Sequence, residues 1–137
     1  MRPSMRLVSL SFAAVLAGVA GLVVPAEPAT AGILPGGMVA LSIHEGDGAD
    51  GKVLKQVDLI CDPVAGKHPK RHEACKALTA VSGDVQRLPG RTAACTRIYQ
   101  PVTAVARGLW QGKWVVFEHH YGNSCELENA LTPVFDF

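Results

Sequence analysis

The sequence predicts a small α+β domain, in which an antiparallel sheet carries helices on one face. Three observations favour this class. Segments with alternating apolar and polar residues are joined by glycine-containing turns, which is typical of hairpins. One segment with apolar residues three and four positions apart lies between two such hairpins, which is typical of a helix. The chain has 137 residues and four cysteines, an even set that would form two disulfides in an exported protein.

The N-terminal segment 1–31 is predicted to be a secretory signal peptide, which leaves 32–137 as the mature domain. Two arginines precede an almost wholly apolar run at 7–24, and the small residues "ATA" at 29–31 form a cleavage site. A membrane anchor is the alternative, because a run of about 18 residues approaches the length of a membrane span. No cluster of Lys or Arg follows the run, whereas the cleavage site does. We therefore expect the mature protein to be secreted and extracellular, without a membrane attachment.

The composition of the mature part indicates one neutral domain. It has 137 − 31 = 106 residues, with 13 − 2 = 11 basic and 12 − 1 = 11 acidic side chains, so its formal charge is zero. Nothing in this balance favours nucleic acid or an anionic membrane surface as a partner. All the cysteines lie in this part, and the sequence alone allows three pairings among them. They are Cys61, Cys75, Cys95 and Cys125.

Residues 38–61 are predicted to form the first hairpin. Apolar residues alternate with smaller or polar ones from 38 to 44, and the turn residues "GDGADG" at 46–51 precede a second strand that ends at Cys61. After the loop "DPVAGKHPK", we expect the first and longer of two helices.

The longer helix is expected from Pro69, which suits a first helical turn, to about Ser82. Its apolar residues recur at helical spacing from 74 to 81, and Gly83 ends it. Residues 84–94 are expected to be irregular surface chain.

Residues 100–121 predict a second hairpin, with strands from about Gln100 to Leu109 and over "WVVFEHHY", joined by the tight turn "WQGK". A short helix follows in "GNSCELENA", with Asn123 or Ser124 as its N-cap. The C-terminal "TPVFDF" is expected to be a final strand. This gives five antiparallel strands in a single domain.

The histidines do not form a metal-binding motif. His72-Glu73 would need a second histidine four residues after the first, where Lys76 stands. His68 precedes Pro69 and is expected outside the helix, so a solvated helix start explains His68 and His72 better than a metal site. His119-His120 are adjacent on a strand and are expected to point to opposite faces. Without a C-x-x-C pair a zinc site of cysteines is also disfavoured, so we expect no metal and no cofactor.

No enzyme is expected either. Composition alone leaves a Ser-His-Asp hydrolase open, but the G-x-S-x-G motif is missing and 106 residues is small for a hydrolase with its own cleft, so this alternative is remote.

The stretch "CTRIYQPV" at 95–102 predicts an exposed segment that is anchored at both ends. Cys95 lies two residues before Arg97, and a strand begins at about Val102. Pro101 fixes one φ angle and favours an extended backbone at Gln100. The β-branched and aromatic residues between them also prefer extended backbone. Arg97 would then stand at the crest, although an ordinary surface loop with a solvated arginine remains the alternative.

Several stretches resemble the bacterial subtilisin-inhibitor family. They are "TRIYQPV", "GLWQGKWVVFEHHYGNSCELENA" and "PVFDF", together with "VDLICDP" and "GKHPKRHEACKALTAVSGD". The resemblance covers nearly all of the mature chain and is weakest at residues 32–52. Its most specific parts are the run from cysteine to "YQPV", the "WQGK" turn and the "NSCE" that follows.

The resemblance implies a secreted inhibitor of serine proteases that acts as a trapped substrate. It implies a five-stranded antiparallel sheet, two helices, a homodimer formed through the sheets, and the bridges Cys61–Cys75 and Cys95–Cys125. An alternative is a secreted module of the same fold directed at another partner, such as a metalloprotease, because fold alone does not settle function.

The resemblance also implies a role for each residue of the exposed segment. Arg97 would enter the S1 pocket of the protease, and Arg97–Ile98 would be the scissile bond. Many family members have an uncharged residue there, so the basic Arg97 favours trypsin-like targets besides subtilisin-like ones. The remaining contact residues would be Cys95, Thr96, Tyr99 and Gln100, supported by Pro101 and Asn123. Thr96 replaces a proline found in several members.

Overall fold

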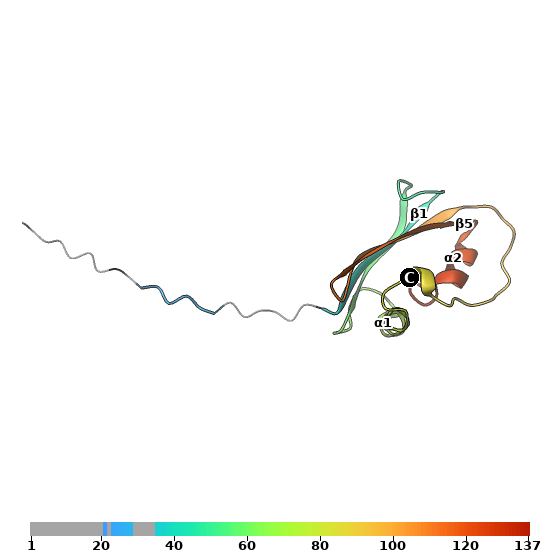
Figure 1. Ribbon diagram of the computed structural model, residues 1–137. Coiled ribbons are helices and arrows are strands. Elements are labelled where there is room, and N and C mark those ends of the chain that lie inside the picture. Colours follow the sequence, from blue (N-terminus) through green and yellow to red (C-terminus); the bar gives the residue numbers. More distant parts are fainter. Residues whose placement is uncertain (1–20, 22, 29–34) are drawn as a thin grey trace, which may run out of the picture. The chain divides into compact units, whose positions relative to one another are not determined.

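A computed structural model of the protein describes residues 21, 23–28 and 35–137, and the folded domain lies in the last of these ranges (Figure 1). The expected cleavage site at 29–31 and most of the expected signal peptide lie outside the described residues. That domain boundary therefore stays a prediction. Among the described residues, no helix is long and apolar enough to cross a membrane.

The domain is an α+β structure with one five-stranded antiparallel sheet, as the sequence predicts. The strand order is β3-β2-β1-β4-β5, so β1 lies at the centre and β3 and β5 form the edges. Along the chain the elements are β1 (Gly37–Glu45), β2 (Val53–Cys61), β3 (Ala65–Gly66), α1 (Arg71–Ala80), the 3-10 helix η1 (Val85–Arg87), β4 (Val102–Trp110), β5 (Lys113–Tyr121) and α2 (Ser124–Leu131).

The β4–β5 hairpin has the tight turn that the sequence predicts. Trp110 pairs with Lys113, which leaves a two-residue loop. Gln111 has φ 47° and Gly112 has φ 78°, so both central residues adopt the positive φ of a type I′ turn. This turn sets the register of β5 against β4 and therefore determines where the hairpin ends.

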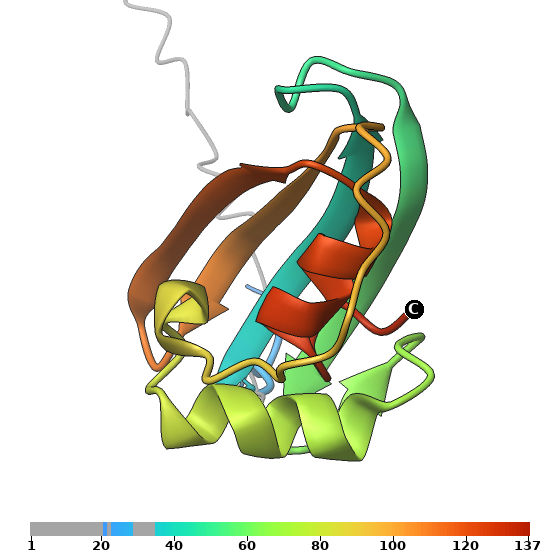
Figure 2. The same cartoon turned by 90° about the vertical axis from the view of Figure 1, so that its right-hand side faces the viewer.

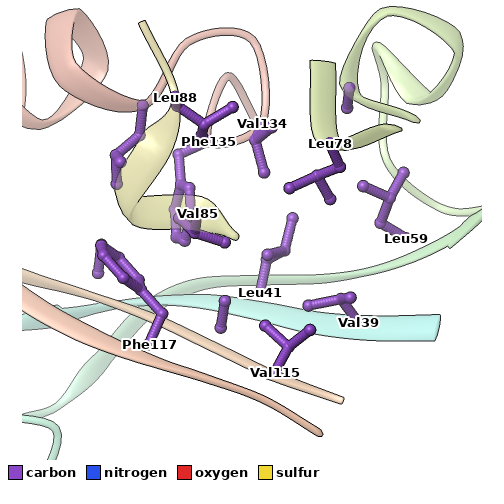
Figure 3. Packing of buried hydrophobic residues seen from close by; sticks show 14 of the residues in the cluster. Val39, Leu41, Leu59, Leu78, Val85, Leu88, Val115, Phe117, Val134 and Phe135 are labelled. Carbon is purple, nitrogen blue, oxygen red and sulfur yellow. The ribbon is translucent and has the colours of Figure 1, made fainter. Parts of the chain in front are cut away.

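One face of the sheet carries the core. Figure 2 shows α1, α2 and the chain between them in front of this face. Leu41 and Leu59 from the sheet and Leu78 from α1 are fully buried. Figure 3 shows their side chains in the core together with Phe117.

The opposite face of the sheet is open and partly apolar. Met38, Leu109 and Trp114 form one cross-strand row through β1, β4 and β5. Their exposed fractions are 50, 41 and 78%. Val116, on the same face, is 67% exposed. A row of this kind is unusual for a surface that stays in water.

The prediction of a C-terminal strand is wrong. After α2 the chain turns, with the Val134 and Phe135 amides donating to the Leu131 carbonyl at 2.9 and 3.2 Å. Val134 and Phe135 are both buried, which a strand with one covered face would not allow for neighbours. The fifth strand is instead β3, in the stretch expected to be loop. A short apolar run does not by itself distinguish a strand from a buried turn.

Helix α1, the segment after it and the start of β4 differ from the prediction. Helix α1 begins at Arg71, so Pro69 lies in the preceding turn and not in the helix. Helix α1 ends at Ala80, two residues before the expected Ser82, and Gly83 lies in the turn that follows, with φ 80° and its amide bonded to the Leu78 carbonyl at 2.8 Å. Residues 84–94 are not only surface chain, because η1 lies there and carries the buried Val85. Strand β4 begins two residues later than expected, after Gln100 and Pro101.

His68 is buried and not solvated as expected. Its ring is 0% exposed. Nε2 donates to the Val134 carbonyl at 2.9 Å, and Nδ1 accepts from the Lys70 amide at 3.0 Å. Both ring nitrogens are thus satisfied in the neutral form, and the ring lies edge-on to Phe137 at 5.5 Å. His68 therefore ties the chain before α1 to the C-terminal segment.

The domain is expected to lose stability as the pH falls below about 6.5. Burial lowers the pKa of His68 below the usual 6.5, although the Val134 carbonyl and the charges of Asp136 and Glu73 oppose this shift. Nδ1 faces an amide donor, so a second proton has no acceptor there. Below pH 6.5 the unfolded chain binds this proton more readily than the folded chain, so the free energy of unfolding decreases. Guanidinium unfolding between pH 7.5 and 5 measures this decrease in the free energy of unfolding.

His68→Gln should flatten this pH dependence, whereas His72→Gln, at an exposed position of α1, should leave it unchanged. An identical slope in the His68 variant and the wild type would contradict the assignment.

Candidate functional site

The segment 94–101 forms an exposed, extended loop between η1 and β4. It contains no helix or strand. Figure 1 shows it at the edge of the domain, beyond α2. Arg97 is exposed, and Ile98 and Tyr99 are 65 and 72% exposed. Large side chains are thus presented to solvent on a backbone that belongs to no regular element.

Two disulfides hold the fold and the loop, and both have the pairing that the resemblance implies. Cys95–Cys125 joins the loop to the first turn of α2, with 5.7 Å between the Cα atoms. Cys61–Cys75 joins the end of β2 to α1, with 5.5 Å between the Cα atoms. The first of these bridges fixes the loop two residues before Arg97.

Asn123 supports the centre of the loop. Its side chain is 8% exposed, and Nδ2 donates to the carbonyl oxygens of Thr96 and Ile98 at 3.2 and 3.1 Å. Its Oδ1 accepts from the Glu126 amide at 3.0 Å, which makes Asn123 the N-cap of α2. One carboxamide therefore caps a helix and holds the backbone on both sides of Arg97.

The loop is also held after Tyr99. The Gln100 amide donates to the Gly122 carbonyl at 2.8 Å, and the Gly46 amide donates to the Pro101 carbonyl at 2.9 Å. Thr103 in turn donates its hydroxyl to the Gly46 carbonyl at 2.8 Å. The chain on the C-terminal side of Arg97 is thus bonded to two other segments before β4 begins.

Two contacts of the loop are not foreseen from the sequence. Asn129 of α2 donates Nδ2 to the Ala93 carbonyl at 2.8 Å and lies 3.1 Å from the Cys95 sulfur. The Asn129 carbonyl and Oδ1 also accept from Arg91 at 2.7 and 3.1 Å. No spacing in the sequence points to Asn129, since its partners lie more than 30 residues away in the chain. Glu126 differs, because the N-x-x-E spacing of a capping box does point to it in the sequence. Its carboxylate accepts from the Gly122 amide at 3.1 Å.

The second contact joins Tyr99 to the turn between β1 and β2. The Tyr99 hydroxyl donates to Oδ1 of Asp47 at 3.3 Å. The negative charge of Asp47 raises the pKa of Tyr99 above its usual value, with smaller effects from desolvation and from the hydrogen bond. The phenol therefore stays protonated and remains a donor at neutral pH.

The structure gives no arrangement of metal ligands in its described part. No group of three or more His, Cys, Asp or Glu side chains is close enough there to hold an ion. His119 and His120 do not diverge as expected: their rings are nearly parallel with centroids 5.8 Å apart, and His119 also packs against Tyr121. With no third ligand beside them, they remain ordinary residues of β5.

The fold and the loop together define a small disulfide-bonded domain with an exposed, extended segment that is held by a disulfide and by hydrogen bonds. Residues 35–123 match the sequence profile described as "Subtilisin inhibitor-like". Subtilisin inhibitor-like protein 1 of Streptomyces cacaoi is 39% identical over 105 residues, which are 72% of this chain and 94% of that protein. The subtilase-type protease inhibitor of Streptomyces fradiae is 37% identical over 106 residues, 75% of each chain.

A solved structure shows the same fold. Sermetstatin of Streptomyces caespitosus, in a crystal structure with Bacillus licheniformis subtilisin, superposes with a TM-score of 0.66 at 30% identity, covering 74% of this chain and 98% of sermetstatin. The chain belongs to the subtilisin inhibitor-like family. The predictions of this family, and of a protease inhibitor rather than an enzyme, are confirmed.

Replacing Asn123 should loosen the loop and destabilise the domain. Asn123→Ala removes the helix cap and the donors to two carbonyls, and we expect a loss of about 1–2 kcal/mol in the free energy of unfolding. Asn123→Ser keeps a cap for α2, so it should lose less stability than Asn123→Ala. Its side chain is too short to hold the loop, so the two variants should lose the same amount of loop order. Guanidinium unfolding measures the stability, and NMR order parameters of the Arg97 and Ile98 amides measure the loop. Unchanged order parameters in both variants would show that Asn123 does not hold it.

Proposed function

We propose that this chain is a secreted inhibitor of serine proteases that binds as a trapped substrate, with Arg97 in the S1 pocket and Arg97–Ile98 as the scissile bond. The observation that carries the proposal is the pair of hydrogen bonds from Asn123 to the Thr96 and Ile98 carbonyls. They hold the backbone on both sides of one exposed side chain. Sermetstatin, which has the same fold, is described in complex with subtilisin.

The charge of Arg97 favours trypsin-like proteases. Arg97 is exposed and takes part in neither of the ion pairs within residues 35–137, so its guanidinium is available to a partner. A carboxylate at the base of S1 would accept a bidentate, desolvated pair from it. Subtilisin-like enzymes remain targets through the loop backbone and the neighbouring residues Cys95, Thr96, Tyr99 and Gln100.

The mechanism follows from the way in which both ends of the loop are held. A serine protease acylates at the Arg97 carbonyl, and the amine of Ile98 is the leaving group. In a flexible peptide this amine diffuses away and water completes the cleavage. Here Asn123 holds the Ile98 carbonyl, and the Gln100 amide is bonded to Gly122. The amine stays beside the acyl group at a high effective concentration, so religation is faster than hydrolysis.

The rigidity also strengthens binding. The disulfide and the hydrogen bonds already order the loop in the free protein, so less conformational entropy is lost when a protease binds. Affinity should therefore depend on the supports Cys95–Cys125, Asn123 and Pro101 as well as on Arg97.

We further propose that residues 1–31 direct export and are removed, and that the mature domain forms a homodimer through its sheets. Two disulfides suit an oxidising, extracellular location. The open row of Met38, Leu109 and Trp114 offers an apolar surface for a second copy. Binding of a metalloprotease through the same fold is the alternative, and it predicts a complex that survives loss of Arg97.

Arg97→Ala should weaken inhibition of trypsin far more than inhibition of subtilisin. Removing one partner of a buried charge pair costs about 2–5 kcal/mol, so the inhibition constant for trypsin should rise at least about 30-fold. Steady-state titration of both enzymes measures it, and Arg87→Ala, an exposed arginine of η1, is the matched control. Equal inhibition of trypsin by the Arg97 variant and the wild type would refute the assignment of the S1 residue.

Removing the Cys95–Cys125 bridge should turn the inhibitor into a substrate. In Cys95→Ser/Cys125→Ser the acyl fragment loses its covalent anchor and is held on the N-terminal side only by the hydrogen bonds from Asn123 and Asn129. We therefore expect steady cleavage after Arg97, seen by mass spectrometry. Cys61→Ser/Cys75→Ser lacks a bridge of the core, at a cost of about 2–5 kcal/mol in stability. While folded, it should still inhibit. Resistance of the fully reduced wild type to cleavage would argue against a trapped loop.

A further inference from the structure

We propose that Asp47, on the turn between β1 and β2, is a specificity-determining residue that favours proteases with a positive charge beside the subsite for Tyr99. The inference rests on the proposed function, in which Arg97 occupies S1 and Tyr99 lies two residues along on the primed side. It extends the contact surface to a turn that is about 50 residues away in the sequence.

Asp47 is held at a fixed place beside the loop. The Tyr99 hydroxyl donates to its carboxylate at 3.3 Å. The preceding residue, Gly46, is bonded through its amide to Pro101 and through its carbonyl to Thr103. Side-chain and backbone contacts therefore join the turn to the C-terminal half of the loop.

The turn is also ordered within itself. The Glu45 amide donates to the Lys52 carbonyl at 2.9 Å, and the Gly51 amide donates to Gly48 at 3.2 Å. The buried His44 donates Nδ1 to the Gly51 carbonyl at 3.0 Å. Asp47 thus sits on a supported turn, and one hydrogen bond from Tyr99 holds its carboxylate beside the loop.

A protease that covers Arg97 and Tyr99 also covers Asp47. Two residues of extended chain span about 7 Å. A standard interface buries about 800 Å² on each partner, which corresponds to a patch of roughly 16 Å radius. Tyr99 is 72% exposed, and its hydroxyl lies against the Asp47 carboxylate. The carboxylate therefore falls inside the area from which a bound protease removes water.

The carboxylate has no cationic partner of its own in the described part of the chain, where the ion pairs are Lys70–Asp136 and Arg107–Glu118. Residues 45–52 carry three acidic side chains and one lysine, a formal charge of −3 + 1 = −2. Removing water from an unpaired carboxylate is unfavourable unless the partner supplies a cation or a donor. A negative charge on the protease at this point would add repulsion.

The contact surface thus presents two opposite charges, one on the loop and one on the turn beside it. Arg97 favours a protease with an acidic S1 pocket, and Asp47 favours a protease with a basic rim beside the subsite for Tyr99. Proteases that share the S1 preference would then be distinguished by the charge of that rim.

Two variants of one trypsin-like protease test this, one with lysine and one with glutamate at a surface position beside the subsite for Tyr99. Asp47→Asn keeps an oxygen acceptor for Tyr99 and removes only the charge. At low ionic strength we expect it to weaken binding of the lysine variant about threefold to fivefold and to strengthen binding of the glutamate variant by a similar factor. The effect should shrink in 0.5 M salt because of screening.

Asp50→Asn is the matched control, with the same change of charge in the same turn and no contact to Tyr99. It should change the ratio of the two dissociation constants much less. An equal ratio for the wild type and Asp47→Asn overturns this inference, as does an equal effect of Asp50→Asn. If the wild type inhibits neither protease, the proposed function itself is refuted. The comparison of the Asp47 variant with the wild type tests only the role of Asp47.

Discussion

The side chain of Asn123 is the constraint on which the exposed loop depends. A carboxamide offers two N–H donors and one carbonyl oxygen. Asn123 uses both donors on the loop and the oxygen on its own helix, so its hydrogen-bonding groups are matched in a largely buried position. Few residues meet this demand, because a hydroxyl has one donor and a carboxylate has none. The loop conformation and the start of α2 are therefore set by the same group.

Helix α2 is the scaffold of the site. It is only eight residues long, yet with its cap it provides the central amide, the disulfide partner Cys125 and the second amide Asn129. Its own position is fixed by Leu127 and Leu131, which are buried against the sheet, and by the turn that follows them. The buried C-terminal segment thus contributes to the site indirectly, because it covers the core beside the helix.

Much of the fold is predictable from local patterns. The two long hairpins, the "WQGK" turn, the turn at Gly83 after α1 and the cap at Asn123 each follow from residues close together in the chain. What local patterns miss depends on tertiary contacts. The two-residue β3 is defined by its pairing with β2, and the C-terminal apolar run packs as a turn that places Val134 and Phe135 in the core.

The site shows the same division. The exposed position of Arg97 between a cysteine and Pro101 is visible in the sequence. The disulfide pairing came from the family resemblance, because four cysteines alone leave three choices. Asn129 and Asp47 carry no sequence signal, since each meets the loop across more than 30 residues. The burial of His68 is not predictable from the sequence for a similar reason, because it depends on the distant C-terminal segment that covers the ring.

Asn123 and Asn129 contact backbone carbonyl oxygens, and Gly122 contacts a backbone amide. A backbone carbonyl is present at positions 93, 96 and 98 whatever the residue type. The side chains at positions 96 to 98 therefore add nothing to the support of the loop that carries them. In the function that we propose, substitution there would change which protease is bound without changing how the domain folds, so one scaffold could serve a series of inhibitors. Evolution and protein engineering have the same freedom at these positions, and the scaffold restricts both to the residues that hold the loop.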